Sequence, residues 1–302
     1  MLVKKVLKLI RNPKKIVYVM IKRGFLNWLS DQTILKIQFK YEMGKKLNLK
    51  NPKTFNEKLQ WLKLYDRNPL YTKLVDKYEV REYIEKEIGK DYLIPLIGVW
   101  DKFEDIDFTK LPERFVLKCT HDSGSVFICT DKSKFNIDEV EKKINKALKR
   151  NYYYFAREWP YKNVKPRIIC EEFISDKEAS PDDYKVLCFN GKAKLIGVHI
   201  DRYSNHKLDN YDIHWNKTLI GKDGPMSDLV YDKPIEFENM IMLSEKLASE
   251  KSHVRIDWFI VDNKLYFGEV TFYEAAGFDH FDNEEDDYLL GSWIKLPKGV
   301  RK

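Results

Sequence analysis

Two carboxylates stand inside a run of residues that otherwise has the composition of a β-hairpin. Asp257 and Glu269 interrupt the segment HVRIDWFIVDNKLYFGEVTFYEAAG, residues 253–277, where Ile, Trp, Phe and Val surround them. A lone carboxylate is costly to bury among apolar side chains. Two acids in one apolar hairpin therefore indicate a shared positive partner.

The length of the hairpin loop decides whether the two acids share a face, because successive residues of a strand point to opposite sides. A two-residue loop would place Asp257 and Glu269 on opposite faces. A three-residue loop, residues 262–264, sets Asp257 opposite Glu269 and Arg255 opposite Thr271. We favour the longer loop, which is a common type, because it gathers the polar side chains on one face.

Two kinds of partner are compatible with a facing pair of carboxylates, which repel each other in a dry site. Mg²⁺ prefers oxygen ligands and often completes its shell with phosphate oxygens. Alternatively, Arg255 neutralises one acid and Lys264 or water serves the other. The hairpin alone leaves both alternatives open.

A second candidate site is a lysine inside an apolar strand. Lys118 lies in RFVLKCTHDSGS, residues 114–125, and a lysine in such a strand needs an anion. Lys77 and Arg81, one turn apart on an expected helix, are able to reach the same anion or to remain solvated. The loop after Lys118 contains small residues whose backbone amides can approach phosphate, namely Thr120, Ser123, Gly124 and Ser125. With one glycine this loop is a weak signal, and a structural ion pair of Lys118 is the alternative.

The segment CEEFIS, residues 170–175, ends a buried strand and can present backbone groups to a purine edge. Glu171 and Glu178 would then bind the exocyclic amine and the ribose hydroxyls. A plain strand end is the alternative for this segment.

The order of the expected elements indicates an α+β fold with at least two lobes. Helices come first, and antiparallel strands with interspersed helices follow. The expected helices cover residues 26–44, 54–66, 72–89, 136–150 and 235–251. The expected strands lie within 92–100, 114–131, 167–175, 183–202 and 253–277, with a tight hairpin turn at Asn190-Gly191.

Composition narrows the class of partner. The 302 residues carry a net charge of +7, which favours an anionic partner such as a nucleotide, a nucleic acid or an acidic lipid and does not choose among them. Residues 1–23 contain Lys and Arg but no acid, and they form either a basic amphipathic helix on an anionic membrane or a helix packed on the body. Four scattered cysteines predict free buried thiols, the histidines have no zinc spacing, and base-stacking motifs are absent, so we expect no nucleic-acid partner.

Taken in order, these segments resemble the ATP-grasp superfamily and, within it, the TupA-like family linked to teichuronopeptide and other cell-surface polysaccharide synthesis. The resemblance is carried by LKNPKTFNEKLQWLKLYDRNPLYTKLVDKYEVREYI, FVLKCTHDSGS, DYKVLCFNGK and VRIDWFIVDNKLYFGEVTFY. It implies two α+β lobes that clamp ATP, preceded by a helical N-terminal extension. The expected division is 1–50 for the basic segment, 51–114 for an N-terminal lobe, 115–175 for the small lobe and 176–302 for the large lobe.

The resemblance also implies roles for individual residues. The lysines on the ATP phosphates would be Lys77 and Lys118, beside the loop of Ser123, Gly124 and Ser125. The adenine would meet a hinge of Glu171, Glu172, Phe173 and Ile174, with Glu178 near the ribose. The Mg²⁺ ligands would be Asp257, Glu269 and Thr271, and Arg255 would face the reacting acyl centre. Lys185 and Arg202 are cationic candidates for holding acidic substrate groups, although surface charges would look the same.

Two positions depart from the superfamily pattern. Thr271 replaces the Asn usual two residues after the metal-binding Glu, and a hydroxyl can still ligate Mg²⁺. The glycine-rich turn reads EAAG, residues 274–277, which puts the acceptor loop in doubt.

The implied activity is an ATP-dependent carboxylate–amine ligase that forms an amide through an acylphosphate. The family suggests an amino acid joined to a uronic acid of a surface polysaccharide, with a small or lipid-linked saccharide acceptor. We expect a cytoplasmic protein, peripheral on the inner face of the plasma membrane. The rivals are a glycosyltransferase, for which DID at residues 105–107 imitates a DxD motif, a sugar kinase, and a non-catalytic nucleotide-binding protein.

Overall fold

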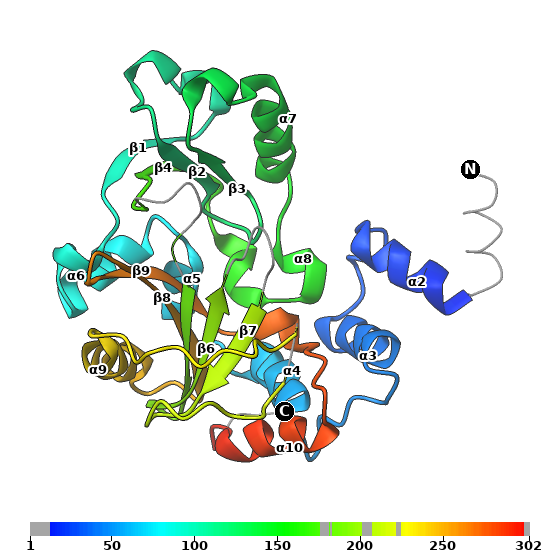
Figure 1. Cartoon of the computed structure of the whole chain (residues 1–302). Helices are drawn as coiled ribbons and strands as arrows, with labels where there is room; N and C mark the ends of the chain where they lie inside the picture. Colours follow the sequence, from blue (N-terminus) through cyan, green and yellow to red (C-terminus); the bar gives the residue numbers. More distant parts are fainter. Residues whose placement is uncertain (1–12, 176–180, 182, 201–206, 222–224, 299–302) are drawn as a thin grey trace.

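The chain forms two antiparallel sheets, a small one from its first strands and a large one from its later strands (Figure 1). The computed structural model describes residues 13–175, 181, 183–200, 207–221 and 225–298. The small sheet has the order β1-β4-β2-β3, formed by β1 (Leu96–Trp100), β2 (Phe115–Cys119), β3 (Val126–Cys129) and β4 (Ile168–Glu172). The large sheet has the order β7-β6-β5-β8-β9, formed by β5 (Asp183–Phe189), β6 (Lys192–Ile200), β7 (Lys207–Tyr211), β8 (His253–Val261) and β9 (Lys264–Thr271).

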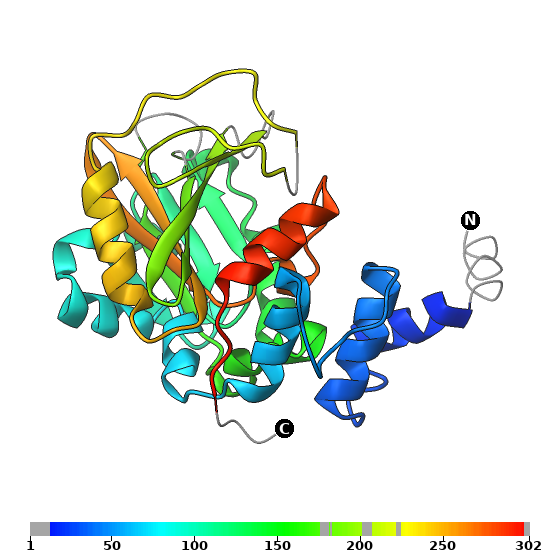
Figure 2. The same cartoon turned by 90° about the horizontal axis from the view of Figure 1, so that it is seen from below.

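Helices cover the outer sides of the two sheets. Helix α7 packs on β2 of the small sheet, and α9 packs on β5, β6 and β8 of the large one. Seen from below, α4 and α10 lie against each other, while α2 and α3 extend to one side (Figure 2). The bounds are α2 (Pro13–Lys22), α3 (Asp31–Glu42), α4 (Phe55–Tyr65), α5 (Leu70–Val75), α6 (Val80–Glu87), α7 (Ile137–Leu148), α8 (Tyr153–Ala156), α9 (Phe237–Ala248) and α10 (Glu284–Trp293).

Each sheet has its own apolar core. Phe115 and Leu117 of β2 pack with Ile144 of α7 in the small-sheet core. Trp258 of β8 and Met240 of α9 belong to the core of the large sheet. Two cores on two sheets confirm the predicted α+β fold with two lobes. The pairing of β1 with β4 extends the small sheet N-terminally of the predicted range 115–175.

Several local predictions are confirmed. The Thr54 hydroxyl accepts the Glu57 backbone N–H at the start of α4, and the Glu57 carboxylate accepts the Thr54 backbone N–H, which completes the capping box. The β5–β6 hairpin turns at Asn190 and Gly191, whose φ angles of 52° and 79° are left-handed. This turn chemistry is readable in the sequence because few residues other than Gly and Asn adopt such angles readily.

The single helix predicted over residues 72–89 is wrong. The chain forms α5 and α6, separated by a turn in which the Asp76 carboxylate accepts the backbone N–H groups of Tyr78 and Glu79 at 2.8 and 3.2 Å. Asp side chains compete with helical hydrogen bonds in this way. Lys77 therefore lies in a turn, and its N–H donates to the carbonyl of Thr120 at 3.1 Å.

The predicted loop of the 253–277 hairpin is also wrong, although its key pairing is confirmed. The turn has two residues, Asp262 and Asn263, and Val261 pairs with Lys264 rather than with Leu265. A register shift after Asp257, which leaves Gly268 as an extra residue, then sets Asp257 opposite Glu269 and Arg255 opposite Thr271. The predicted extra residue is thus in a β-bulge within β9 instead of in the loop.

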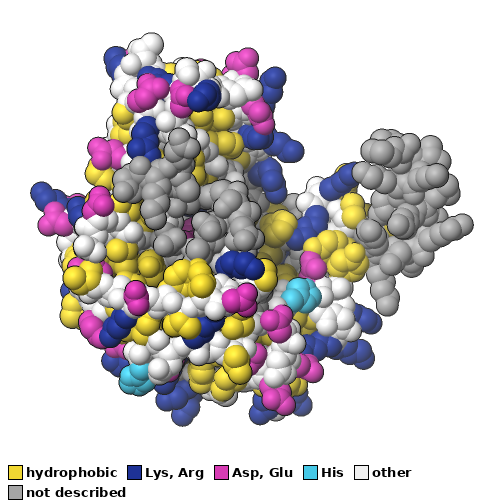
Figure 3. Space-filling model, in the orientation of Figure 1, with side chains coloured by type: hydrophobic (Ala, Val, Ile, Leu, Met, Phe, Trp, Pro, Cys, Tyr) yellow, Lys and Arg dark blue, Asp and Glu magenta, His cyan; other side chains and the backbone are white. Residues whose placement is uncertain are grey.

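The N-terminal part differs from its prediction in extent. The expected helix over residues 26–44 is shorter, because α3 begins after the N-cap Ser30, whose hydroxyl accepts the Thr33 N–H. The basic segment up to residue 12 lies outside the described residues. Among the described helices none is long and apolar enough to cross a membrane. On the face drawn in Figure 3, basic and acidic side chains are interspersed over both lobes.

Candidate active site

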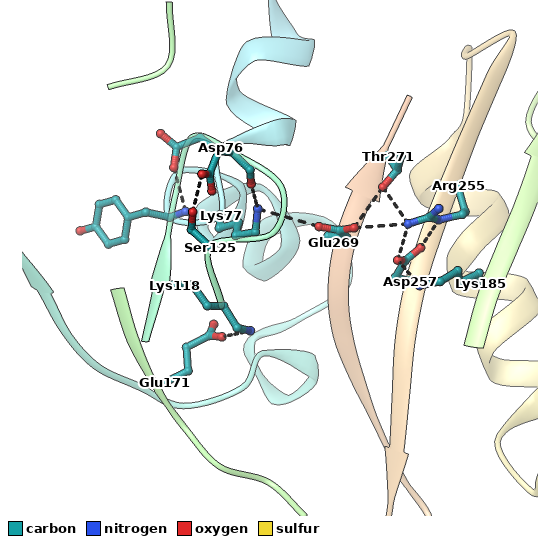
Figure 4. Close-up of polar contacts among 12 residues, drawn as sticks. Asp76, Lys77, Lys118, Ser125, Glu171, Lys185, Arg255, Asp257, Glu269 and Thr271 are labelled. Atoms are coloured by element: carbon teal, nitrogen blue, oxygen red, sulfur yellow. Dashed lines mark hydrogen bonds and ion pairs between the residues drawn. The ribbon is translucent and has the colours of Figure 1, made fainter. Parts of the chain in front are cut away.

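Three oxygen-bearing side chains converge on one guanidinium near the start of β8 and the end of β9 (Figure 4). Nη2 of Arg255 lies 2.7 Å from Oδ2 of Asp257, 3.3 Å from Oε1 of Glu269 and 3.2 Å from Oγ1 of Thr271. Nε of Arg255 donates to the other Asp257 oxygen at 2.6 Å. Arg255 thus contacts both acids, as the second alternative expects, and the magnesium alternative stays a prediction. Lys264 takes no part, because its Nζ stacks on the Tyr266 ring at the hairpin turn.

A second cation, Lys185, forms an ion pair with Asp257. Lys185 on β5 donates to Oδ2 of Asp257 at 2.8 Å and to Asp183 at 2.6 Å, and it is buried. Burial by itself would raise the pKa of Asp257, but the charges and hydrogen bonds of Arg255 and Lys185 hold that pKa well below its usual range. Lys185 thus positions Asp257, and it lies among the buried side chains rather than at a surface where it would meet substrate.

The donor set fits a hard divalent cation. No group of three or more His, Cys, Asp or Glu side chains among the described residues could hold a metal by itself. Two carboxylates and a hydroxyl nevertheless reach one nitrogen of Arg255, so one positive centre is within reach of all three oxygens. Mg²⁺ is usually bound through one or two carboxylates, with phosphates and water completing its shell. Asp257, Glu269 and Thr271 match that requirement.

Lys77 connects this group to the small sheet. Its Nζ donates to the carbonyl of Asp122 in the β2–β3 loop at 2.6 Å and lies 3.9 Å from Oε2 of Glu269. In the same loop the Ser125 hydroxyl donates to the Asp122 carboxylate, which folds the loop back towards Lys77. Gly124 has a left-handed φ of 100°, a conformation that glycine adopts without strain.

Lys118 is paired inside the protein. Its Nζ lies 2.6 Å from Oε2 of Glu171, and Nη1 of Arg81 lies 2.9 Å from Oε1 of the same carboxylate. Glu171 is buried and doubly paired, so it does not present its side chain to a purine as predicted. It instead orients Lys118, while Arg81 keeps the carboxylate neutralised.

A cleft of about 360 Å³ joins these residues. It is lined by the predicted residues Lys77, Lys118, Ser123, Gly124, Glu171, Asp257 and Glu269, together with Val126, Asp183, Phe259 and Gly268. We call it the central cleft. It places two lysines from the small-lobe side opposite the carboxylates of the large sheet.

A smaller apolar pocket of about 80 Å³ adjoins the central cleft. The two share Lys118, Val126, Asp183 and Phe259. The rest of the apolar pocket is lined by Ile94, Val116, Ile128, Glu172, Phe173, Ile174 and Pro181. Three of the four predicted hinge residues thus lie together beside a surface suited to a flat apolar ring.

A third cavity, of about 420 Å³, adjoins the central cleft. It shares Ser123 and Glu269 with the central cleft, and Arg255 and Thr271 also line it. Its remaining lining is rich in aromatic side chains, and we call it the aromatic cleft: Lys22, Glu42, Tyr152, Phe155, Glu158, Tyr161, Tyr273, Ala275, Ala276, Phe278 and His280.

The family of the chain follows from its match to a model of known sequences. A family model described as TupA-like ATPgrasp matches residues 57–295, which is well over half of the chain. This chain belongs to the TupA-like ATP-grasp family. The matched range includes both sheets and every described residue of the central cleft.

Solved structures similar to this TupA-like chain include ATP-grasp ligases. D-alanine–D-alanine ligase from Bacillus anthracis complexed with ATP is 18% identical, with 66% of this chain and 55% of that chain covered and a TM-score of 0.38. The ADP complex of the purK protein, N5-carboxyaminoimidazole ribonucleotide synthetase, is 15% identical, with 72% and 50% covered and a TM-score of 0.42. The chain spans about half the length of these two proteins. A likeness at these identities concerns the fold alone, and no curated protein matches the chain significantly.

The remaining predictions concern two single residues and one short motif. Glu178 and Arg202 lie outside the described residues. The DID segment lies apart from the three cavities, and Asp107 within it caps a short 3₁₀ helix by accepting the Thr109 N–H at 3.1 Å. That role argues against the DxD interpretation.

Other residues of these cavities were missed. Asp183 lines both the central cleft and the apolar pocket, and Glu158 lines the aromatic cleft. The sequence offered one signal for each residue. For Asp183 it was the pair of acids in PDDYK before a strand, and for Glu158 it was the aromatic run NYYYFAREWPY.

Proposed function

We propose that this chain is an ATP-dependent carboxylate–amine ligase that forms an amide through an acylphosphate. Family membership supports an ATP-grasp ligase. The observation that carries the proposal is the convergence of Asp257, Glu269 and Thr271 on one positive centre. That centre is Nη2 of Arg255 in the structure, and Lys77 and Lys118 line the central cleft together with Asp257 and Glu269.

The three cavities suggest how the substrates are arranged. The apolar pocket would take the adenine against Phe173 and Ile174, and the central cleft would take the triphosphate. The substrates to be joined would occupy the aromatic cleft, which shares Ser123 and Glu269 with the central cleft. In this arrangement the terminal phosphate lies at the border of the two clefts.

The residues supply mainly charge and position. A substrate carboxylate attacks the γ-phosphoryl group of ATP, the bond to the β-phosphate oxygen breaks, and ADP leaves. Lys77 and Lys118 offset the negative charge that develops on the phosphates. Asp257, Glu269 and Thr271 would hold a Mg²⁺ ion, and the bound ion would neutralise part of the charge on the phosphates. Arg255 reaches the aromatic cleft, where its guanidinium stabilises the oxyanion formed when an amine attacks the acylphosphate and phosphate leaves.

We propose a uronic acid and an amino acid as the substrates, in the synthesis of a cell-surface polysaccharide. Aromatic rings are common stacking partners for flat apolar or cationic groups, and the aromatic cleft offers several. A lipid-linked acceptor would suit a peripheral position on the cytoplasmic face of the membrane. Phe25 and Trp28, in the connection between α2 and α3, are 65% and 78% exposed near the exposed Arg23, which supports contact with an anionic membrane surface.

A phosphate-release screen tests the activity. Glucuronate and galacturonate are each mixed with single amino acids, Mg²⁺ and ATP. A ligase releases ADP and free phosphate only when both the acid and the amine are present. ADP without free phosphate indicates a sugar kinase, and binding without turnover indicates a nucleotide-binding protein. Either result would overturn the ligase proposal.

A further inference from the structure

Glu158 is a buried carboxylate that lines the aromatic cleft, and no cation of the described residues forms an ion pair with it. It follows α8, is 6% exposed and lines the cleft together with Arg255 and Glu269. The described residues supply no ion pair to its carboxylate within 4.0 Å and no hydrogen bond. Burying an unpaired charge is costly, so such a group gains stability from a positive partner.

The two cations nearest in charge effect to Glu158, Lys63 and Lys22, contact other groups. Lys63 on α4 is fully buried, and its Nζ donates to Oε1 of Gln60 and to the carbonyls of Ala156 and Ala276 at 3.1, 2.9 and 2.7 Å. These contacts use all three of its N–H groups. Lys22 on α2 lies 3.3 Å from the centre of the Phe155 ring.

The pKa of the Glu158 carboxyl also indicates that its charged form has too little positive charge nearby. Burial raises the pKa of the Glu158 carboxyl to about 7, and the negative charge of Glu269 raises this pKa further. The positive charges of Lys63 and, more weakly, Lys22 lower it. Burial likewise lowers the pKa of Lys63 to about 7. A cation placed in the cleft beside Glu158 would restore its charged form.

We propose that Glu158 binds the ammonium group of the amine substrate and takes one of its protons, so that the neutral amine attacks the acylphosphate, and that Glu158 thereby selects amino compounds as acceptors. The inference rests on the proposed ligase function and deepens it. Tyr152, Phe155 and Tyr161 line the same cleft and add ring faces that attract an ammonium. Arg255 lines the cleft as well, so an amine held at Glu158 shares the cavity with the group assigned to the oxyanion.

The test separates acylphosphate formation from use of the amine. Hydroxylamine is uncharged at pH 7.5 and attacks an acylphosphate to give a hydroxamate and free phosphate, so it does not need an anionic side chain. Wild-type protein, Glu158→Gln and the control Glu139→Gln are assayed with ATP, Mg²⁺ and glucuronate or galacturonate. The second nucleophile is hydroxylamine or an amino acid from serine, glutamate, lysine and alanine. Glu139 is an exposed residue of α7 paired with Lys143 at 2.5 Å, and it lines none of the three cavities.

Glu158→Gln is expected to keep hydroxamate formation and to raise the KM for the amino acid about 10- to 150-fold, the effect of losing a charged hydrogen bond. The KM for ATP stays within about twofold, Glu139→Gln behaves as wild type, and Glu158→Asp shows an intermediate KM for the amino acid. Retained hydroxamate formation also shows that the variant is folded. An unchanged KM for the amino acid in Glu158→Gln overturns the inference and leaves the ligase proposal standing. Absence of hydroxamate with wild-type protein overturns both.

Discussion

Replacing Lys118 with methionine tests the assignment of the central cleft to the nucleotide phosphates. Lys118 Nζ lies 2.6 Å from Glu171, and their side chains are 17% and 8% exposed. Methionine keeps most of the length of the side chain and removes its charge. Breaking a buried pair usually costs 3–5 kcal/mol, roughly, because the remaining charge is left unpaired.

That cost is reduced here, because Arg81 remains 2.9 Å from the other oxygen of Glu171. We therefore expect a loss of stability of about 1 kcal/mol, the scale of one hydrogen bond, and a folded variant. A charged hydrogen bond to phosphate contributes about 1.5–3 kcal/mol. Since 1.36 kcal/mol is about a factor of ten, the affinity for Mg·ADP should fall about 10- to 150-fold.

Calorimetric titration with Mg·ADP measures this affinity, and urea unfolding measures the stability. The matched control is Lys165→Met, because Lys165 makes an exposed ion pair with Asp101 at 2.8 Å in the same lobe and lines none of the three cavities. The control should bind Mg·ADP as wild type does. If folded Lys118→Met binds Mg·ADP within about twofold of wild type, Lys118 makes no net contribution to phosphate binding and the reasoning fails.

Three further predictions concern packing, thiols and pH. In Gly291→Ala the new Cβ would lie 2.3 Å from the carbonyl oxygen of Lys53, so urea unfolding should show a loss near the upper end of about 1–3 kcal/mol; wild-type stability would contradict the α4–α10 contact. Burial raises the pKa of Cys119 and Cys170 to about 12 and covers all four thiols, so DTNB should react only after unfolding. The Glu158 carboxyl is charged above its pKa of about 7, so the KM for an amino acid should rise as pH falls below 7, and this dependence should vanish in Glu158→Gln.

Local sequence patterns predicted much of the fold. The capping box at Thr54 and Glu57 and the turn at Asn190-Gly191 depend on neighbouring residues only, and both are confirmed. The break between α5 and α6 was missed. It depends on Asp76 accepting N–H groups in a turn that also binds a carbonyl of the β2–β3 loop. The contact between Lys77 and Thr120 joins residues 43 positions apart and leaves no periodic signal in the sequence. The helical pattern of residues 72–89 therefore decided the prediction.

The site was predictable to the extent that its residues lie in one hairpin. The pairing of Asp257 with Glu269 was predicted correctly although the loop length was wrong. One extra residue is needed to bring the polar side chains onto one face, and it has this effect both in the loop and in the strand. The role of Lys185 was not predictable, since its position beneath Asp257 follows from the pairing of β5 with β8. Glu158 was missed for the same reason, because its environment is assembled from α4, α8 and β9.

The central claim is that Glu269 and Asp257 hold the magnesium that accompanies the nucleotide. The most direct test measures the affinity of wild type and Glu269→Gln for ADP, with Mg²⁺ and with EDTA. The claim predicts that Mg²⁺ strengthens ADP binding to wild type, and that Glu269→Gln loses this gain while keeping the metal-free affinity. An equal gain from Mg²⁺ in both proteins would contradict it.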